Sequence, residues 1–285
     1  MTANTFDAPI LVLGGTGKTG RRVVRHLTAA NRSVRVGSRT GEPPFEWTDE
    51  RTWDGVLAGV ESVYLVYYPD LAAPGAVDTV RAFTARAVAA GVRRLVLLSG
   101  RGEPAAQLSE EVVRNSGVAW TILRASWFNQ NFSEDFLADF VTDGAVLLPA
   151  GEVAEPFVDA EDIAEIAAEA LTGDRHAGQL YELTGPRLLT FAEATAEIAR
   201  AAGRPIHYES MPPEGYAAEM ARYDVPAELV GVLVDLFGQV LDGRNAYLTD
   251  GVRRALGREP RDFAEYAREA AATGVWAAPA PVDAS

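Results

Sequence analysis

The chain is poor in the side chains that build metal centres and covalent nucleophiles. It has no cysteine, which excludes disulfides, thiolate nucleophiles and zinc–thiolate sites. Its three histidines, His26, His176 and His207, are far apart in sequence, so we expect no metal site. No apolar run approaches the length of about 18 residues that spans a membrane, and no secretory leader is apparent. We therefore expect a cytoplasmic protein with no membrane partner.

Positive charge is also scarce. The formal net charge is −14, which opposes binding to a phosphate backbone. The densest basic cluster, Arg21, Arg22 and Arg25, follows a glycine-rich stretch, where we expect it to serve a cofactor rather than nucleic acid. A chain of 285 residues, 48% of them hydrophobic, can bury a sizeable core. We expect a small-molecule partner, no nucleic acid, and a monomer or homodimer.

Glycines spaced three apart follow the first apolar run, Ile10 to Leu13. Gly14 would permit a tight turn, Gly17 a close approach to a pyrophosphate, and Gly20 close packing of helix on strand. The helix that follows would present its positive N-terminal end to the anion. A P-loop is excluded because its spacing needs glycine at position 12, where Val12 stands. The motif predicts dinucleotide binding, and an ordinary turn is the alternative.

Strand and helix patterns alternate through the first half of the chain. Apolar runs at 9–13, 33–37, 62–67, 93–98 and 118–123 are typical of parallel strands covered on both faces. Residues 41–55 lack a clear strand, and any strand there would be short and near 45–47. The later pattern predicts helices at 160–171, 190–202, 213–222, 226–241, 249–256 and 260–272, with one strand at 179–183.

The fold class that follows is α/β, a Rossmann-type doubly wound parallel sheet with a smaller, mainly helical C-terminal substrate lobe. We place an NADP-binding domain at 1–150 and the helical lobe at 151–285, with some of its elements returning to the sheet. The Pro/Ala-rich tail from Ala277 is expected to be disordered.

The second strand ends in Gly37-Ser38-Arg39. An acidic residue at this point would select the ribose hydroxyl of NAD, whereas an arginine can bind the 2′-phosphate of NADP. Ser38 and Arg39 therefore favour NADP(H), and a solvated loop arginine is the alternative.

Several motifs besides the glycines occur in one order: Leu97–Ser99, Thr121–Arg124, Trp127–Phe132, Phe157–Ala164 and Leu183–Pro186. Together they resemble the NmrA-like branch of the atypical short-chain dehydrogenase/reductase family, and within it the bacterial relatives of ergot-alkaloid (agroclavine or festuclavine) dehydrogenases. The resemblance implies strand order 3-2-1-4-5-6, a ligand cleft at the carboxyl ends of the strands, and hydride transfer between NADP(H) and an iminium or its reduced amine.

A missing pair of residues bears on the chemistry. Short-chain dehydrogenases use a Tyr-x-x-x-Lys pair, in which the lysine lowers the tyrosine pKa. Lys18, in the glycine loop, is the chain's single lysine, and no tyrosine has lysine four residues on. Three interpretations remain open: an imine or iminium reductase that needs no protein acid, a quinone or azo reductase protonated by solvent, and a non-catalytic NADP(H) sensor. We favour the first, with the catalytic residues unknown.

The candidate site residues lie on the glycine loop and at the ends of the predicted strands. For the aromatic candidates, packing in the core is the alternative role. The cofactor candidates are Gly14, Thr16, Gly17, Lys18, Thr19, Gly20, Ser38, Arg39, Tyr67, Tyr68, Ser99 and Ala125. The substrate candidates are Trp127, Phe128, Asn131 and Phe132.

Overall fold

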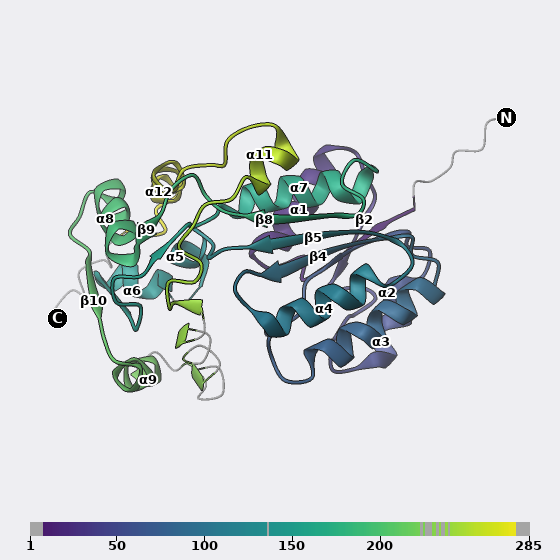
Figure 1. Ribbon diagram of the computed structural model, residues 1–285, viewed down its shortest axis with the longest axis horizontal. Helices are drawn as coiled ribbons and strands as arrows, with labels where there is room; N and C mark the ends of the chain where they lie inside the picture. Colours follow the sequence, from purple (N-terminus) through teal and green to yellow (C-terminus); the bar gives the residue numbers. More distant parts are fainter. Residues whose placement is uncertain are drawn as a thin grey trace, which may run out of the picture. The chain divides into compact units, whose positions relative to one another are not determined.

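The computed structural model describes residues 8–135, 137–222, 225, 230, 231, 234, 237, 238 and 240–277 (Figure 1). The chain forms two compact units. The sheet unit comprises Met1–Ala125, Ala160–Leu183 and Asp250–Arg258, and the second unit comprises Ser126–Asp159, Thr184–Thr249 and Glu259–Ser285. This division differs from the predicted boundary at residue 150. Residues 126–159 leave the sheet unit early, and two later segments return to it.

The sheet unit is built on six parallel strands in the order β2-β1-β3-β4-β5-β8. Their bounds are β1 Ile10–Leu13, β2 Val34–Gly37, β3 Ser62–Leu65, β4 Arg94–Gly100, β5 Ala119–Ala125 and β8 Gln179–Leu183. Strands β1 and β3 are almost wholly buried, as expected for a parallel sheet with helices on both faces. Because all six strands run in one direction, their carboxyl ends meet at one edge of the sheet.

Helices cover both faces of this sheet (Figure 1). On one face, α1 (Lys18–Ala29) packs against α7 (Ala160–Thr172), and on the other α3 (Ala76–Ala89) packs against α4 (Pro104–Arg114). Shorter helical segments are η1 (Glu50–Thr52), α2 (Trp53–Leu57) and α11 (Gly251–Leu256). The doubly wound α/β prediction is confirmed, and the predicted strand at 179–183 matches β8.

The outer third strand implied by the resemblance is absent from the described part of the chain, so the expected order 3-2-1-4-5-6 was wrong. Strand β2 forms the edge, and residues 45–47 are not a strand. Phe45 and Trp47 instead bury their rings in the core, where Trp47 lies 5.1 Å from the ring of Phe83. The indole Nε1 of Trp47 also donates a hydrogen bond to the carbonyl of Val66. Burial of two large aromatic rings outweighs strand pairing here.

Among its described residues the second unit is mainly helical, as predicted, and it also contains four short strands. Its helices are α5 Asn131–Glu134, α6 Leu137–Asp143, α8 Phe191–Ala202, α9 Pro213–Arg222 and α12 Phe263–Ala272. Strand β6 (Ala145–Leu148) pairs in parallel with β10 (His207–Ser210), and β7 (Ala154–Glu155) pairs antiparallel with β9 (Leu189–Thr190). Much of the predicted helix at 226–241, and the tail after 277, lie outside the described residues.

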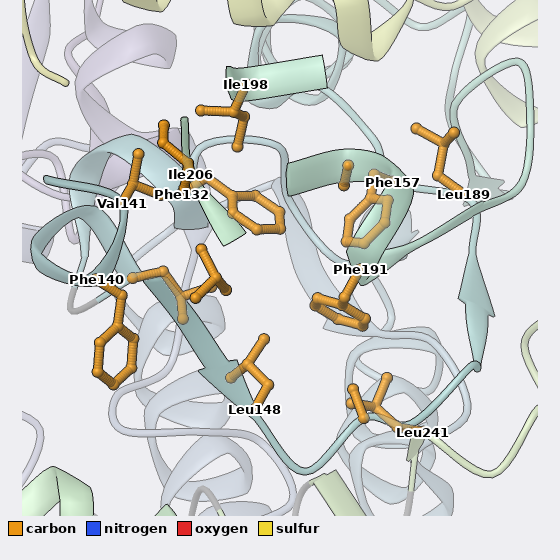
Figure 2. Packing of buried hydrophobic residues seen from close by; sticks show 14 of the residues in the cluster. Phe132, Phe140, Val141, Leu148, Phe157, Leu189, Phe191, Ile198, Ile206 and Leu241 are labelled. Carbon is orange, nitrogen blue, oxygen red and sulfur yellow. The ribbon is translucent and has the colours of Figure 1, made fainter. Parts of the chain in front are cut away.

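Aromatic and aliphatic side chains together fill the core of the second unit (Figure 2). Phe132, Phe157 and Phe191 contact one another with ring centroids 5.1–6.2 Å apart. Helix α8 begins at this core with a capping box, in which the Thr190 hydroxyl accepts from the Glu193 N–H and the Glu193 carboxylate accepts from the Thr190 N–H. This capping box fixes where α8 starts, and the helix predicted at 190–202 is confirmed.

Candidate functional site

The glycine loop turns the chain from β1 into α1. Gly14 has φ +61°, a left-handed conformation that favours glycine, and its N–H donates to the carbonyl of Gly37 on the neighbouring strand. The N–H of Gly17 then donates to the Gly14 carbonyl at 2.9 Å, which closes the turn. The predicted role of Gly14 in a tight turn is confirmed.

Gly20 allows the helix to approach the strand. A Cβ at this position would lie 2.7 Å from the carbonyl carbon of Gly14 and 2.8 Å from the Cα of Gly15, so no side chain fits. Gly15 carries a similar constraint that the spacing argument overlooked, because a Cβ there would lie 2.8 Å from a methyl of Val36. At Gly17 a Cβ would meet the Gly14 oxygen at 3.3 Å, so its predicted approach to a pyrophosphate stays a prediction.

The N-terminus of α1 is open to an anion. Gly17 occupies the N-cap position and offers no side-chain cap, and the first turn holds no acidic residue. Gly14, Thr16 and Gly17 are exposed, whereas Lys18 is half-buried and Thr19 is buried. Backbone N–H groups of the first turn lack intrahelical acceptors, and the dipole of this 12-residue helix favours negative charge at this end. The loop therefore fits a dinucleotide pyrophosphate.

Arg39 stands beside this loop. Strand β2 pairs with β1 as far as Leu13 opposite Gly37, so Ser38 and Arg39 follow at the same sheet edge as Gly14. The carbonyl of Ser38 accepts hydrogen bonds from the N–H groups of Gly41 and Phe45, which closes the loop after it. The guanidinium of Arg39 is exposed and makes no ion pair or hydrogen bond with the described residues. It is available to a phosphate.

The clustered arginines of α1 have a different role from the expected one. Arg22 and Arg25 both form ion pairs with Glu161 on α7, Arg22 through its Nε at 2.9 Å. These pairs join α1 to α7. The structure shows both arginines bound to one carboxylate from a distant part of the sequence, and the expectation that the cluster serves a cofactor stays a prediction.

Tyr67 and Tyr68 follow β3 at the same edge and differ in exposure. The ring of Tyr67 packs 4.9 Å from that of Trp47 and is half-buried, whereas Tyr68 is 71% exposed. Tyr68 is thus the better placed of the two to contact a ligand. Ala125 ends β5 and is buried.

Ser99 takes part in an ion-pair network that the sequence did not predict. Its buried hydroxyl donates to Glu110 at 2.7 Å, and Arg124 donates to the same carboxylate through Nε at 2.9 Å. Arg124 also binds Glu182 on β8, and its hydrogen bond to Glu110 raises the pKa of Arg124. The network ties α4, β4, β5 and β8 together. The contact of Ser99 with cofactor or substrate stays a prediction.

The ends of β3 and β4 carry a pair of carboxyl groups that sequence reasoning also missed. Glu103 is the N-cap residue of α4, and Asp70, in the segment after β3, is one of the groups that act on its carboxyl group. Desolvation by burial is the main cause that raises the pKa of Glu103 to about 8, and the charges of Asp70 and Glu110 add to it. A carboxyl group that titrates near neutral pH is typical of functional sites.

The aromatic substrate candidates belong to the second unit. The half-buried ring of Trp127 stacks on Phe237 with centroids 5.4 Å apart, and its edge contacts Phe191. Phe128 and Asn131 are also half-buried. Phe132 instead lies wholly inside the core, so a substrate contact there would require the core to open and we do not retain it.

Two kinds of feature are absent from the described part of the chain. No group of three or more potential metal ligands occurs among the residues that the structure describes. Within the same residues, no helix combines the length and apolar character needed to cross a membrane.

Fold and loop together define a Rossmann-type protein with the features of a dinucleotide site. The model of the NmrA-like family matches residues 107–267, and the chain belongs to this family. Agroclavine dehydrogenase from Claviceps fusiformis is 33% identical over 278 residues, covering 90% of this chain and 95% of the relative. An NAD(P)H azoreductase from Xenophilus azovorans is 31% identical over 285 residues, covering 92% and 98%.

Solved structures support the fold. The NADPH complex of an NADPH-dependent quinone oxidoreductase from Escherichia coli superimposes with a TM-score of 0.75 at 22% identity, covering 91% of this chain and 99% of that one. The reductases among the relatives make this chain an oxidoreductase homologue.

Proposed function

We propose that the protein is an NADP(H)-dependent reductase that transfers hydride to a flat, electron-poor organic substrate, with an imine or iminium carbon as the main acceptor. The observation that carries the proposal is the exposed Arg39, unpartnered within the described residues, beside the open N-terminus of α1. A planar guanidinium can bind the 2′-phosphate through paired hydrogen bonds. The backbone N–H groups after Gly17 would hold the pyrophosphate.

The residues of the chain would contribute mainly by binding and positioning. The bound dihydronicotinamide supplies a hydride. An iminium ion already carries the positive charge that this hydride neutralises, so its reduction needs no proton donor. Because the chain's single lysine, Lys18, lies in the glycine loop, no tyrosine can be activated in the usual way. Trp127 and Phe128 could hold a flat cation by stacking and cation–π attraction.

A quinone or azo reductase is the second candidate. The specific observation that favours it is the carboxyl pair of Glu103 and Asp70, because quinone and azo acceptors need a proton as well as a hydride. The azoreductase relative at 31% identity supports the same class. A protein that binds NADP(H) without catalysis would lack turnover of all these acceptors.

The test begins with calorimetric titration of NADPH and NADH, followed by absorbance assays of NADPH oxidation. The acceptors are a cyclic iminium, a cyclic imine, a benzoquinone and an azo dye. Tighter binding of NADPH and turnover of the iminium support the main proposal. Turnover of the quinone or dye alone moves the assignment to the second candidate. Equal affinity for the two cofactors contradicts the role of Arg39, and absence of any turnover contradicts the assignment as a reductase.

A further inference from the structure

We propose that Gln130 and Asp159 are positioning residues for the substrate, because their hydrogen bond holds the loop that carries Trp127 in one conformation. Trp127 would then present its ring to a flat cation in one orientation. The inference rests on the proposed function and adds to it the residues that orient the acceptor. All three residues belong to the second unit.

The first step in the argument is the backbone around Trp127. Shortly after β5 ends, the chain forms a parallel bridge in which Phe128 pairs with Val158. The N–H of Val158 donates to the carbonyl of Trp127 at 2.8 Å, and the N–H of Asn129 donates to the carbonyl of Val158 at 2.9 Å. The backbone on both sides of Phe128 is therefore tied to the residue that precedes Asp159.

The second step is the side-chain bond that comes next along both segments. The Nε2 atom of Gln130 donates to Oδ1 of Asp159 at 2.7 Å, and the two residues are 2% and 1% exposed. An ionised carboxylate only accepts hydrogen bonds, so the amide nitrogen of Gln130 must face it. A hydrogen bond to a charged group is among the stronger ones, and burial prevents water from replacing it. The bond therefore closes the loop after Trp127.

The third step is that Asp159 is itself held in place. The N–H of Gly185 donates to the carbonyl of Pro156 at 3.1 Å, and a Cβ on Gly185 would lie 2.1 Å from the carbonyl oxygen of Phe157. This close approach is between backbone and backbone, so no flexible side chain can move to relieve it. Nε of Arg261 lies 3.6 Å from Oδ2 of Asp159 and offsets its negative charge. Asp159 is thus a fixed anchor for the loop.

The fourth step is the ring that the loop carries. Phe237 stacks on the indole of Trp127 with an interplanar angle of 22°, and Phe191 contacts it edge-on. Trp127 is half-buried, so part of its surface stays open to a ligand. Cation–π attraction requires the cation to lie over the ring, so a tilt of the indole would turn the acceptor carbon away from the incoming hydride. A misplacement of about 1 Å can cost on the order of a hundredfold in rate.

The experiment compares the parent chain with Gln130→Met, which keeps the side-chain length and removes the hydrogen bond to Asp159. The control is Tyr208→Phe, which removes the hydrogen bond from the Tyr208 hydroxyl to the carbonyl of Gly151 in the same unit. Each protein is labelled with 5-fluorotryptophan, and Trp127→Phe identifies the Trp127 fluorine resonance among the five tryptophans. We expect Gln130→Met to broaden or split this resonance, and Tyr208→Phe to leave it unchanged.

Kinetics then test the consequence for the reaction. In Gln130→Met, kcat for an N-alkyl cyclic iminium should fall by about ten- to a hundredfold, because fewer bound substrates are correctly oriented. Its KM and the Kd for NADPH should each change by less than about threefold, since the substrate still finds an indole to stack on. Loss of stability alone would lower the amount of folded protein, measured by circular dichroism, without changing kcat per folded molecule.

A second variant adds a pH profile. Gln130→Glu places two carboxyl groups together in a buried site, where they share a proton at low pH and repel each other once both are ionised. At pH 5.5 the shared proton restores a hydrogen bond to Asp159, so the ratio of variant to parent kcat should be close to one and should fall toward pH 9. The Trp127 resonance should change over the same range. If Gln130→Met does not fold, this variant supplies the comparison.

The outcomes separate the two proposals. A Trp127 resonance that neither substitution of Gln130 alters overturns the inference, whatever the protein reduces. An altered resonance with undiminished kcat overturns the role in orienting the acceptor. If the resonance is altered but the parent chain reduces no acceptor, the role in catalysis fails together with the proposed function, and only the positioning of Trp127 is supported.

Discussion

The two sides of one sheet edge have opposite electrostatic characters. On the β1–β2 side, an uncapped helix N-terminus and the exposed Arg39 offer positive potential to an anion. On the β3–β4 side, burial together with the negative charges of Asp70 and Glu110 raises the pKa of Glu103 to about 8. The difference teaches that a protein with net charge −14 can still bind a phosphorylated cofactor, because local charge rather than total charge decides binding.

The largest expected effect comes from a substitution in the glycine loop, on the anion-binding side of the sheet edge. Gly17→Val places a branched side chain where the backbone would approach the pyrophosphate, so we expect NADPH binding to weaken by more than a hundredfold while the far-ultraviolet circular dichroism stays native. Gly173→Val is the control, since a Cβ there meets nothing closer than 3.7 Å. Cofactor fluorescence measures binding. Tight binding by a folded Gly17→Val protein would show that the glycines serve only the turn.

The next largest effect comes from substituting Arg39, which tests the preference for NADPH over NADH. Arg39→Ala should weaken NADPH binding by about 1.5–3 kcal/mol, the scale of hydrogen bonds to a charged group, and leave NADH binding nearly unchanged. Arg81→Ala, which removes an exposed arginine on α3, should alter neither affinity. Isothermal titration calorimetry measures both cofactors. A parallel loss for NADPH and NADH would mean that Arg39 does not contact the 2′-phosphate.

A smaller effect concerns stability on the acidic side. A raised pKa means that the folded protein binds the Glu103 proton more tightly than the unfolded chain does, so this carboxyl group destabilises the fold increasingly as pH rises from about 4.5 to about 8. Glu103→Gln should remove this loss. The difference in unfolding free energy between variant and parent should shift in favour of the variant by on the order of 1–2 kcal/mol from pH 5 to pH 9. The shift is this small because solvent screens a half-exposed group. Urea titrations at both pH values measure it, and an unchanged difference contradicts the raised pKa.

The smallest expected effect is close to none. Replacing Tyr67 or Tyr68 by Phe should leave turnover of an iminium within about tenfold of the parent, since loss of a true general acid costs about 10²–10⁴-fold. Steady-state kinetics with NADPH measure it. A hundredfold loss in a variant that still binds NADPH would identify a tyrosine proton donor on the β3 side of the sheet edge.

Features fixed by neighbouring residues could be predicted from the sequence. The glycine loop, the start of α1 and the start of the helix at residue 190 depend on short spacings, and the structure bears out these features. Parallel strands could be predicted because continuous apolar runs are typical of buried sheets.

Features that depend on distant residues could not be predicted. Asp70 and Glu103 come together only because β3 pairs with β4, and neither residue belongs to a motif. Likewise, no local pattern links Glu161 to the arginines of α1. Phe132 shows a further limit, because an aromatic residue near a strand end looks the same in sequence whether it faces a ligand or fills a core.

The ion pair between Arg22 and Glu161 also has a consequence for synthesis. The two residues are separated by 139 positions, and α7, which carries Glu161, packs on α1 in the finished sheet unit. At ribosomal rates of about 5–20 residues per second, α1 would wait roughly 7–28 seconds for this partner. Until then the parts of β3, β4 and β5 that α7 covers are exposed, so chaperone occupancy of a stalled nascent chain should decline once residues 160–183 have emerged.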